Sequence, residues 1–140
     1  MTTYETRLDI KSWDENPYRE LADGTKFARA EVTLAAGADE ADAAGADTAL
    51  TEGSFEALLY YKADGTSTYV TLMSLTGTVE GRSGRLVLAG DGGYDGKTAR
   101  MRGDVIEATG DLAGLTGTVV SESTHEDYPH MPLILTYELG

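Results

Sequence analysis

Residues 54–75 read SFEALLYYKADGTSTYVTLMSL and carry the clearest fold signal in the chain. Two runs rich in strand-forming residues, 54–62 and 67–75, flank the dipeptide Asp64-Gly65. Glycine tolerates the positive φ of the tight turns that join antiparallel strands. This stretch therefore predicts a β-hairpin.

The turn also predicts which side chains share a face of this hairpin. With only two residues in the turn, we expect Tyr60 opposite Tyr69 and Glu56 opposite Met73. Successive strand residues point to opposite faces. One face then mixes rings, a thioether, a hydroxyl group and a carboxyl group: Glu56, Leu58, Tyr60, Tyr69, Thr71, Met73 and Leu75. The other face is more aliphatic: Phe55, Ala57, Leu59, Tyr61, Thr68, Val70, Leu72 and Ser74.

These two faces allow two interpretations. In the first, the mixed face lines a small-molecule pocket and the aliphatic face is a subunit contact. In the second, the aliphatic face is the ordinary core and the mixed face is half exposed. The first interpretation predicts a homo-oligomer, a dimer in preference to a trimer, joined near Leu59, Val70 and Leu72.

The rest of the chain repeats this alternation between glycine-containing turns. Asp95-Gly96 predicts a second hairpin, and the tripeptide NPY (16–18) is expected to end the first strand. Eight strands at this spacing are typical of an antiparallel barrel or sandwich. We favour a lipocalin-like, eight-stranded antiparallel barrel in one domain, residues 1–140, because closure leaves no exposed sheet edge. The expected strands are residues 3–13, 25–36, 54–62, 67–75, 84–94, 97–108, 114–124 and 131–139.

Two features outside the strands need an interpretation. Residues 37–53 are rich in Ala, Gly and Asp without alternation, which predicts a mobile loop, either a lid over a pocket or a surface insertion. The pentapeptide LTGTV occurs at 75–79 and again at 115–119. No lysine follows in a phosphate-loop pattern, so we interpret the repeat as two barrel corners where glycine permits a bend.

Composition excludes several classes of function. The chain has 140 residues, no cysteine and a formal net charge of −13. Without cysteine there are no disulfides, thiolate nucleophiles or zinc–thiolate sites. The negative charge argues against nucleic acid and anionic membrane surfaces as partners. With no apolar run of about 18 residues and no visible signal peptide, we expect a cytoplasmic protein.

Hydrolytic and metal chemistry find little support. The only imidazoles are those of His125 and His130, and no G-x-S-x-G nucleophile elbow is present. His125, Glu126, Asp127 and His130 are plausible metal-ligand types, but their spacing matches no metal signature and two prolines make the segment a loop. We therefore expect no cofactor and no metal site.

Five segments resemble a family of small bacterial proteins of unassigned function among the allene oxide cyclase-like barrels. They are IKSWDENPY (10–18), YKADGTSTYV (61–70), LTGTVEGRSGRLVL (75–88), DGGYDG (91–96) and ATGDLAGLTG (108–117). The resemblance runs from about Ile10 to Leu139 with the motifs in the same order. It implies an eight-stranded antiparallel barrel with a central cavity.

Some barrels of this superfamily are natural-product cyclases. They include spirotetronate Diels–Alder cyclases, and small proteins that form transannular six-plus-four and four-plus-two adducts look similar. By analogy, we expect a cofactor-independent intramolecular cyclase, or isomerase, of the pericyclase type that acts on an apolar polyketide-like substrate. The alternative is a barrel that binds a small hydrophobic ligand without turnover.

A pericyclic cyclase needs a shaped wall and one hydrogen-bond donor onto a substrate carbonyl group. The candidate catalytic donors are Tyr60, Tyr69 and His130. The candidate substrate-binding residues are Trp13, Glu56, Leu58, Thr71, Met73 and Met101.

Overall fold

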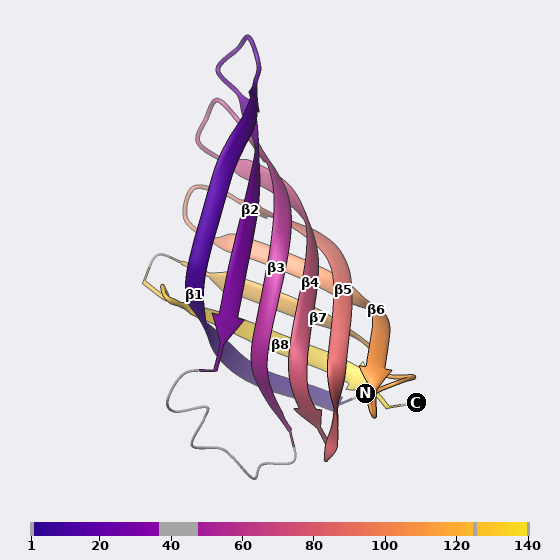
Figure 1. Cartoon of the computed structure of the whole chain (residues 1–140). Coiled ribbons are helices and arrows are strands. Elements are labelled where there is room, and N and C mark those ends of the chain that lie inside the picture. The colour runs from indigo at the N-terminus through magenta and orange to yellow at the C-terminus, as the bar shows by residue number, and fades with distance from the viewer. Residues whose placement is uncertain (1, 37–47, 125, 140) are drawn as a thin grey trace.

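The computed structural model describes residues 2–36, 48–124 and 126–139, and these residues form a closed antiparallel barrel. Each strand pairs with the next along the chain, and β1 closes the ring by pairing with β8 (Figure 1). The predicted all-β, eight-stranded fold is thus confirmed. The strands are β1 (Thr2–Glu20), β2 (Lys26–Ala35), β3 (Ala49–Tyr61), β4 (Ser67–Val79), β5 (Arg82–Tyr94), β6 (Ala99–Gly110), β7 (Thr116–Ser123) and β8 (His130–Glu138).

The first strand is longer than the sequence suggested. Its first half pairs with β8 as far as Asp9, and its second half continues along β2 to Glu20. Pro17 does not end the strand as predicted, because an irregularity in the pairing between Pro17 and Arg19 accommodates it. The β1–β2 hairpin consequently projects beyond its neighbours (Figure 1).

The predicted register of the β3–β4 hairpin is wrong by one residue. Leu59, not Tyr60, pairs with Tyr69. The loop holds five residues, closed by a hydrogen bond from the Lys62 N–H to the Thr66 carbonyl oxygen at 2.9 Å. The Asp64 carboxylate accepts a hydrogen bond from the Thr66 N–H at 2.9 Å, a side-chain turn that competes with the tight two-residue turn.

A shift of one residue moves half of the hairpin to the other face. Each predicted face therefore divides between the interior and the surface. The buried or partly buried inward set is Phe55, Ala57, Leu59, Tyr61, Ser67, Tyr69, Thr71, Met73 and Leu75. The outward set is Glu56, Leu58, Tyr60, Thr68, Val70, Leu72 and Ser74. The expected contact surface near Leu59, Val70 and Leu72 is corrected accordingly, because Leu59 lies inside.

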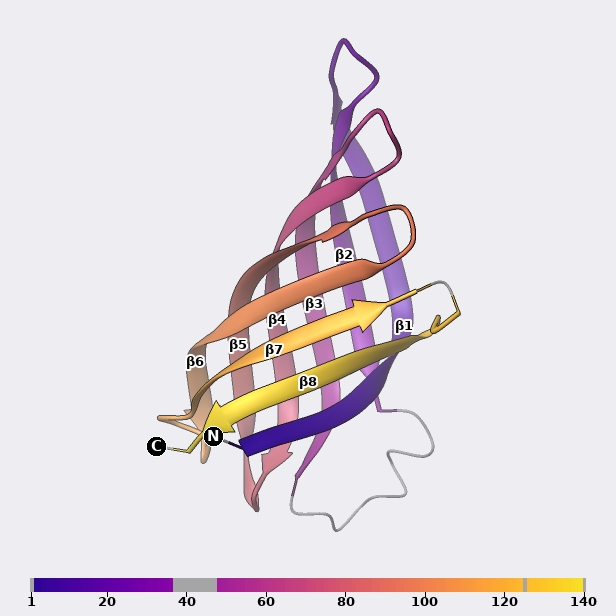
Figure 2. The ribbon, with the colours of Figure 1, turned by 180° about the vertical axis from the view of Figure 1, so that it is seen from behind.

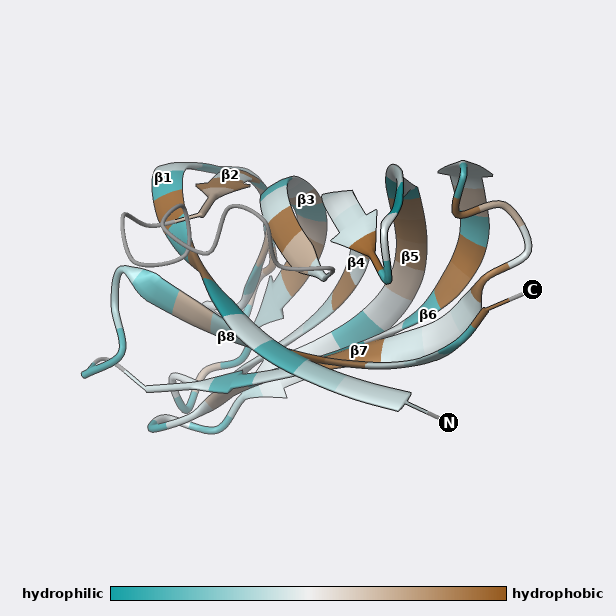
Figure 3. Ribbon diagram, turned by 90° about the horizontal axis from the view of Figure 1, so that it is seen from below, coloured by the Kyte–Doolittle hydropathy of each residue, from teal (hydrophilic) through white to brown (hydrophobic). Residues whose placement is uncertain are grey.

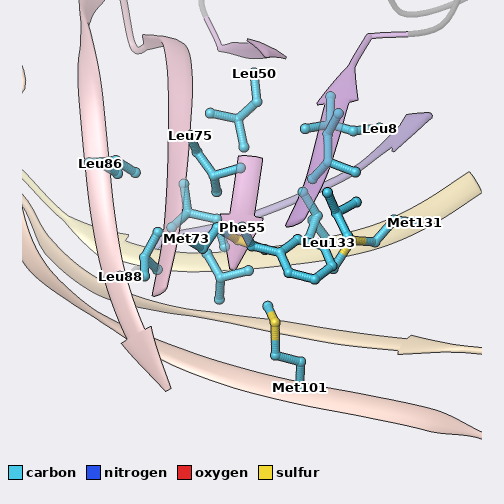
Figure 4. Packing of buried hydrophobic residues seen from close by; sticks show 14 of the residues in the cluster. Leu8, Leu50, Phe55, Met73, Leu75, Leu86, Leu88, Met101, Met131 and Leu133 are labelled. Carbon is cyan, nitrogen blue, oxygen red and sulfur yellow. The ribbon is translucent and has the colours of Figure 1, made fainter. Parts of the chain in front are cut away.

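One end of the barrel is filled by aliphatic side chains. Leucines from several strands meet there and leave almost no accessible surface (Figure 4). Both chain ends lie at this end, and seen from below the ribbons alternate between hydrophobic and hydrophilic bands (Figures 2 and 3). This packing supplies hydrophobic stabilisation and fills the end of the barrel where the two chain ends lie. Its fully buried members include Leu8, Leu50, Leu75, Val79, Leu86, Leu112, Val119, Leu133 and Leu135.

The repeated pentapeptide marks close approaches between strands. A Cβ atom on Gly77 would lie 2.3 Å from the Ala49 carbonyl oxygen, and one on Gly117 would lie 2.3 Å from the Thr136 carbonyl oxygen. Any larger residue would force neighbouring strands apart. The repeat therefore has a structural role in strand packing.

The predicted loop at 37–53 is shorter at its second end, because Ala49–Gly53 belongs to β3. The predicted lid falls on residues 37–47, which lie outside the described residues. The parts of the chain that the structure describes contain no helix long and apolar enough to cross a membrane.

Candidate functional site

The barrel opens into a pocket at the end opposite the packed leucines. Its volume is about 420 Å³, within the usual range for small-molecule sites. Residues near the β3–β4, β5–β6 and β7–β8 connections surround it, together with residues from the middle of β1 and β2. The pocket is therefore the interior of the barrel where the core ends.

One wall of the pocket is apolar and comes from β1, β2, β3 and β8. A bulge between Ile10 and Ser12 lets both Ile10 and Trp13 line the pocket. The Trp13 ring meets the Phe55 ring edge to face, with centroids 6.1 Å apart. Ala30 and Ala57 also line this wall, and their small side chains leave room in the pocket.

The facing wall, from β4 to β7, mixes apolar and hydroxyl side chains. Its members include Ser67, Tyr69, Met101, Ser121 and Ser123. The Tyr69 hydroxyl group donates a hydrogen bond to the Arg100 carbonyl oxygen at 2.6 Å. Burial raises the pKa of the Tyr69 phenol above its ordinary value.

Two polar pairs lie at the mouth. The Tyr61 hydroxyl group donates to a Glu15 carboxylate oxygen at 2.5 Å, and burial followed by this contact raises the pKa of the phenol. The Nδ1 atom of His130 lies 2.6 Å from Asp9 Oδ1, which joins the start of β8 to β1. This contact occupies Nδ1 and leaves Nε2 as the second nitrogen of the ring.

The structure brings four of the predicted site residues together at the pocket. Trp13, Tyr69, Met101 and His130 line it. Thr71 and Met73 are buried and point inward, but they do not border it.

The other three predicted site residues lie outside the barrel. Glu56 binds Arg29, with Oε1 2.8 Å from Nη2. Leu58 is 49 % exposed. The Tyr60 ring packs against the Phe27 ring, 5.4 Å away, on the outer face. Their placement in the pocket was wrong because the hairpin register was wrong.

Two of the three proposed donors offer no free proton to a bound molecule. Tyr60 faces away from the pocket and Tyr69 uses its proton on Arg100, whereas His130 borders the pocket with its Nδ1 atom bound to Asp9. Sequence reasoning missed Ser67 and Ser121, which a five-residue hairpin loop and the alternation along β7 would have placed inside.

The described ranges 2–36, 48–124 and 126–139 contain no group of three or more His, Asp or Glu residues that could hold an ion. The weighed set of His125, Glu126, Asp127 and His130 includes one residue, His125, outside those ranges.

Comparison with known proteins identifies the family and supports the fold. A family model described as protein of unknown function (DUF3224) matches residues 5–135. A crystal structure of a protein of unknown function from this family, from Shewanella oneidensis MR-1, superposes with a TM-score of 0.69 at 17 % sequence identity and covers 99 % of both chains. No protein with a curated description matches the sequence. The chain therefore belongs to the DUF3224 family of proteins of unknown function.

Proposed function

We propose that the pocket binds a small, apolar, polyketide-like molecule and promotes an intramolecular cyclisation of it. The observation that carries this proposal is the pocket of about 420 Å³ at the open end of the barrel. Its apolar wall, with Trp13 and Phe55 set edge to face, favours a hydrocarbon skeleton over a charged metabolite.

Cyclisation is a reaction that such a pocket can accelerate with few polar groups. Both reacting partners belong to one molecule, so the protein contributes by holding a folded conformer. A hydrogen bond to a carbonyl group next to a diene or dienophile would lower the barrier further. The side chains of Met101 and Met131, one on each side of the pocket, are flexible enough to follow an irregular folded substrate.

The test is turnover of a candidate substrate. The protein is incubated with the linear or macrocyclic polyene intermediate of the pathway encoded beside its gene, and product formation is compared with buffer alone. We expect faster cyclisation with wild-type protein and with Leu58→Phe, which alters the outer face. Ala57→Phe, which fills the pocket from the neighbouring position, should remove the acceleration.

Equal rates with and without protein would contradict the cyclase proposal. If the intermediate nevertheless binds and Ala57→Phe prevents binding, the protein is a carrier for an apolar ligand. Far-ultraviolet circular dichroism on both variants verifies that each retains the barrel.

A further inference from the structure

Two serine hydroxyl groups in the pocket wall have no hydrogen-bond partner among the described residues. Ser67 begins β4 and Ser121 lies in β7, and they are only 6 % and 4 % exposed. Neither side chain makes a hydrogen bond within the described part of the chain. A hydroxyl group buried this deeply normally has a partner, because leaving it unsatisfied costs free energy.

Both hydroxyl oxygens are accessible from the pocket. Ser67 and Ser121 border it, as do Tyr94 and Met101, which pair with them across the sheet. Among the described residues, every side-chain nitrogen or oxygen atom that is inaccessible to solvent has a hydrogen-bond partner. The two serine oxygens have no partner among these residues, so they must be accessible to solvent. The pocket is the space that both residues border.

The unpartnered hydroxyl groups lie on one side of the pocket. The opposite wall presents Ile10, Trp13, Phe55 and Leu59. Tyr61 also belongs to that wall, but it already donates its proton to Glu15. The pocket thus has a mainly hydrocarbon side, from β1 to β3 and β8, and a hydroxyl side, from β4 to β7, with Lys97, Arg100 and His130 also on its border.

We propose that Ser67 and Ser121 are ligand-binding residues and that the ligand is a neutral, oxygenated hydrocarbon. Its hydrocarbon face would pack against Trp13 and Phe55, and its carbonyl or hydroxyl oxygens would meet β4 and β7. A serine hydroxyl group both donates and accepts, so it suits ketones, esters and alcohols alike. A net charge of −13 disfavours an anionic ligand.

The two serines offer separate hydrogen-bonding positions in the pocket. Three strand steps separate β4 from β7, which is about 14 Å along the curved sheet. One oxygen atom of the ligand near either hydroxyl group is therefore enough to form a hydrogen bond. This inference rests on the proposed binding function and adds the chemical class of the ligand.

The test uses two probes of the same shape, the ketone 2-acetylnaphthalene and the alkene 2-isopropenylnaphthalene. Dissociation constants are measured by equilibrium dialysis for wild type, Ser67→Ala, Ser121→Ala, the double variant and a control, Ser74→Ala, which alters an outward hydroxyl group on β4. We expect wild type and the control to bind the ketone roughly twofold to twelvefold more tightly than the alkene. The double variant should bind both probes equally.

The outcomes separate this inference from the function on which it rests. If wild type binds the alkene as tightly as the ketone, the serines are not ligand-binding residues, although the pocket still binds apolar molecules. If the double variant keeps the full preference for the ketone, the inference is also contradicted. If neither probe binds wild type, the binding function fails and the inference fails with it.

Discussion

The Tyr69 hydroxyl group is 2.6 Å from the Arg100 carbonyl oxygen, to which it donates its hydrogen bond. The bond joins β4 to β6 across β5. Tyr69 was predicted from the sequence to donate a hydrogen bond to a substrate, but this bond already uses its proton. Tyr69 is therefore a wall residue whose polar atom stabilises the barrel.

Replacement of Tyr69 by phenylalanine should affect stability more than function. Loss of the hydrogen bond to Arg100 is expected to lower the free energy of unfolding by about 1 kcal/mol. Ligand affinity and turnover should change by less than about twofold, because no ligand hydrogen bond is lost. Urea denaturation and a binding titration measure the two effects. A large loss of affinity with unchanged stability would show that the phenol serves the ligand.

The register of the β3–β4 hairpin can be tested with two neighbouring leucines. Leu59 is 8 % exposed and Leu58 is 49 % exposed. We expect Leu59→Ala to lower the free energy of unfolding by about 2–4 kcal/mol and Leu58→Ala to lower it by less than about 0.5 kcal/mol. The reverse order of the two effects would restore the register predicted from the two-residue turn.

Stability should decline at alkaline pH. Burial first, and then its hydrogen bond to Glu80, raise the pKa of the Tyr137 phenol above the ordinary value of 10.0. A raised folded pKa means that this stabilisation is complete below pH 10 and is lost at higher pH, where the unfolded chain releases the proton and the folded chain retains it. Urea midpoints measured from pH 8 to 11 should fall above pH 10, and less steeply in Tyr137→Phe. An equal fall in both proteins would contradict this assignment.

The homo-oligomer expected from the sequence remains a prediction, with a corrected surface. Leu58, Val70 and Leu72 are each about half exposed and lie together on the outer face of β3 and β4. Beside them, Arg29 binds Glu31 and Glu56, which neutralises much of the local charge and favours a second copy over a strongly charged partner. Light scattering at micromolar concentration should give a dimer mass for wild type and a monomer mass for Leu72→Lys. A monomeric wild type would contradict the prediction.

Much of the fold could be predicted from the sequence because it depends on local signals. Alternation and Asp-Gly turns located the eight strands, and closure follows from the need to pair every edge. The length of β1 could not be predicted, since the irregularity that accommodates Pro17 depends on pairing with β2.

The site was harder to predict because its polar atoms bind residues that are far away in the sequence. Tyr69 and Arg100 are 31 positions apart, and Asp9 and His130 are 121 positions apart. No local pattern reveals that these polar atoms already have partners. The hydrogen bond from Thr66 to Asp64 is local, but the turn it stabilises shifts the register by one residue and places the opposite set of β3 side chains inside.

The central claim, that the open end of the barrel binds an apolar molecule, is tested most directly by the fluorescence of Trp13. It is the single tryptophan of the chain and it lines the pocket. Retinol, a polyene alcohol that accepts energy from tryptophan, is titrated into wild type, Ala57→Phe and Leu58→Phe. We expect saturable quenching with equal affinity in wild type and Leu58→Phe, and at least a tenfold weaker affinity in Ala57→Phe. The reason is that Ala57 borders the pocket and Leu58 does not. Quenching that is absent in wild type, or unchanged by Ala57→Phe, would contradict the account.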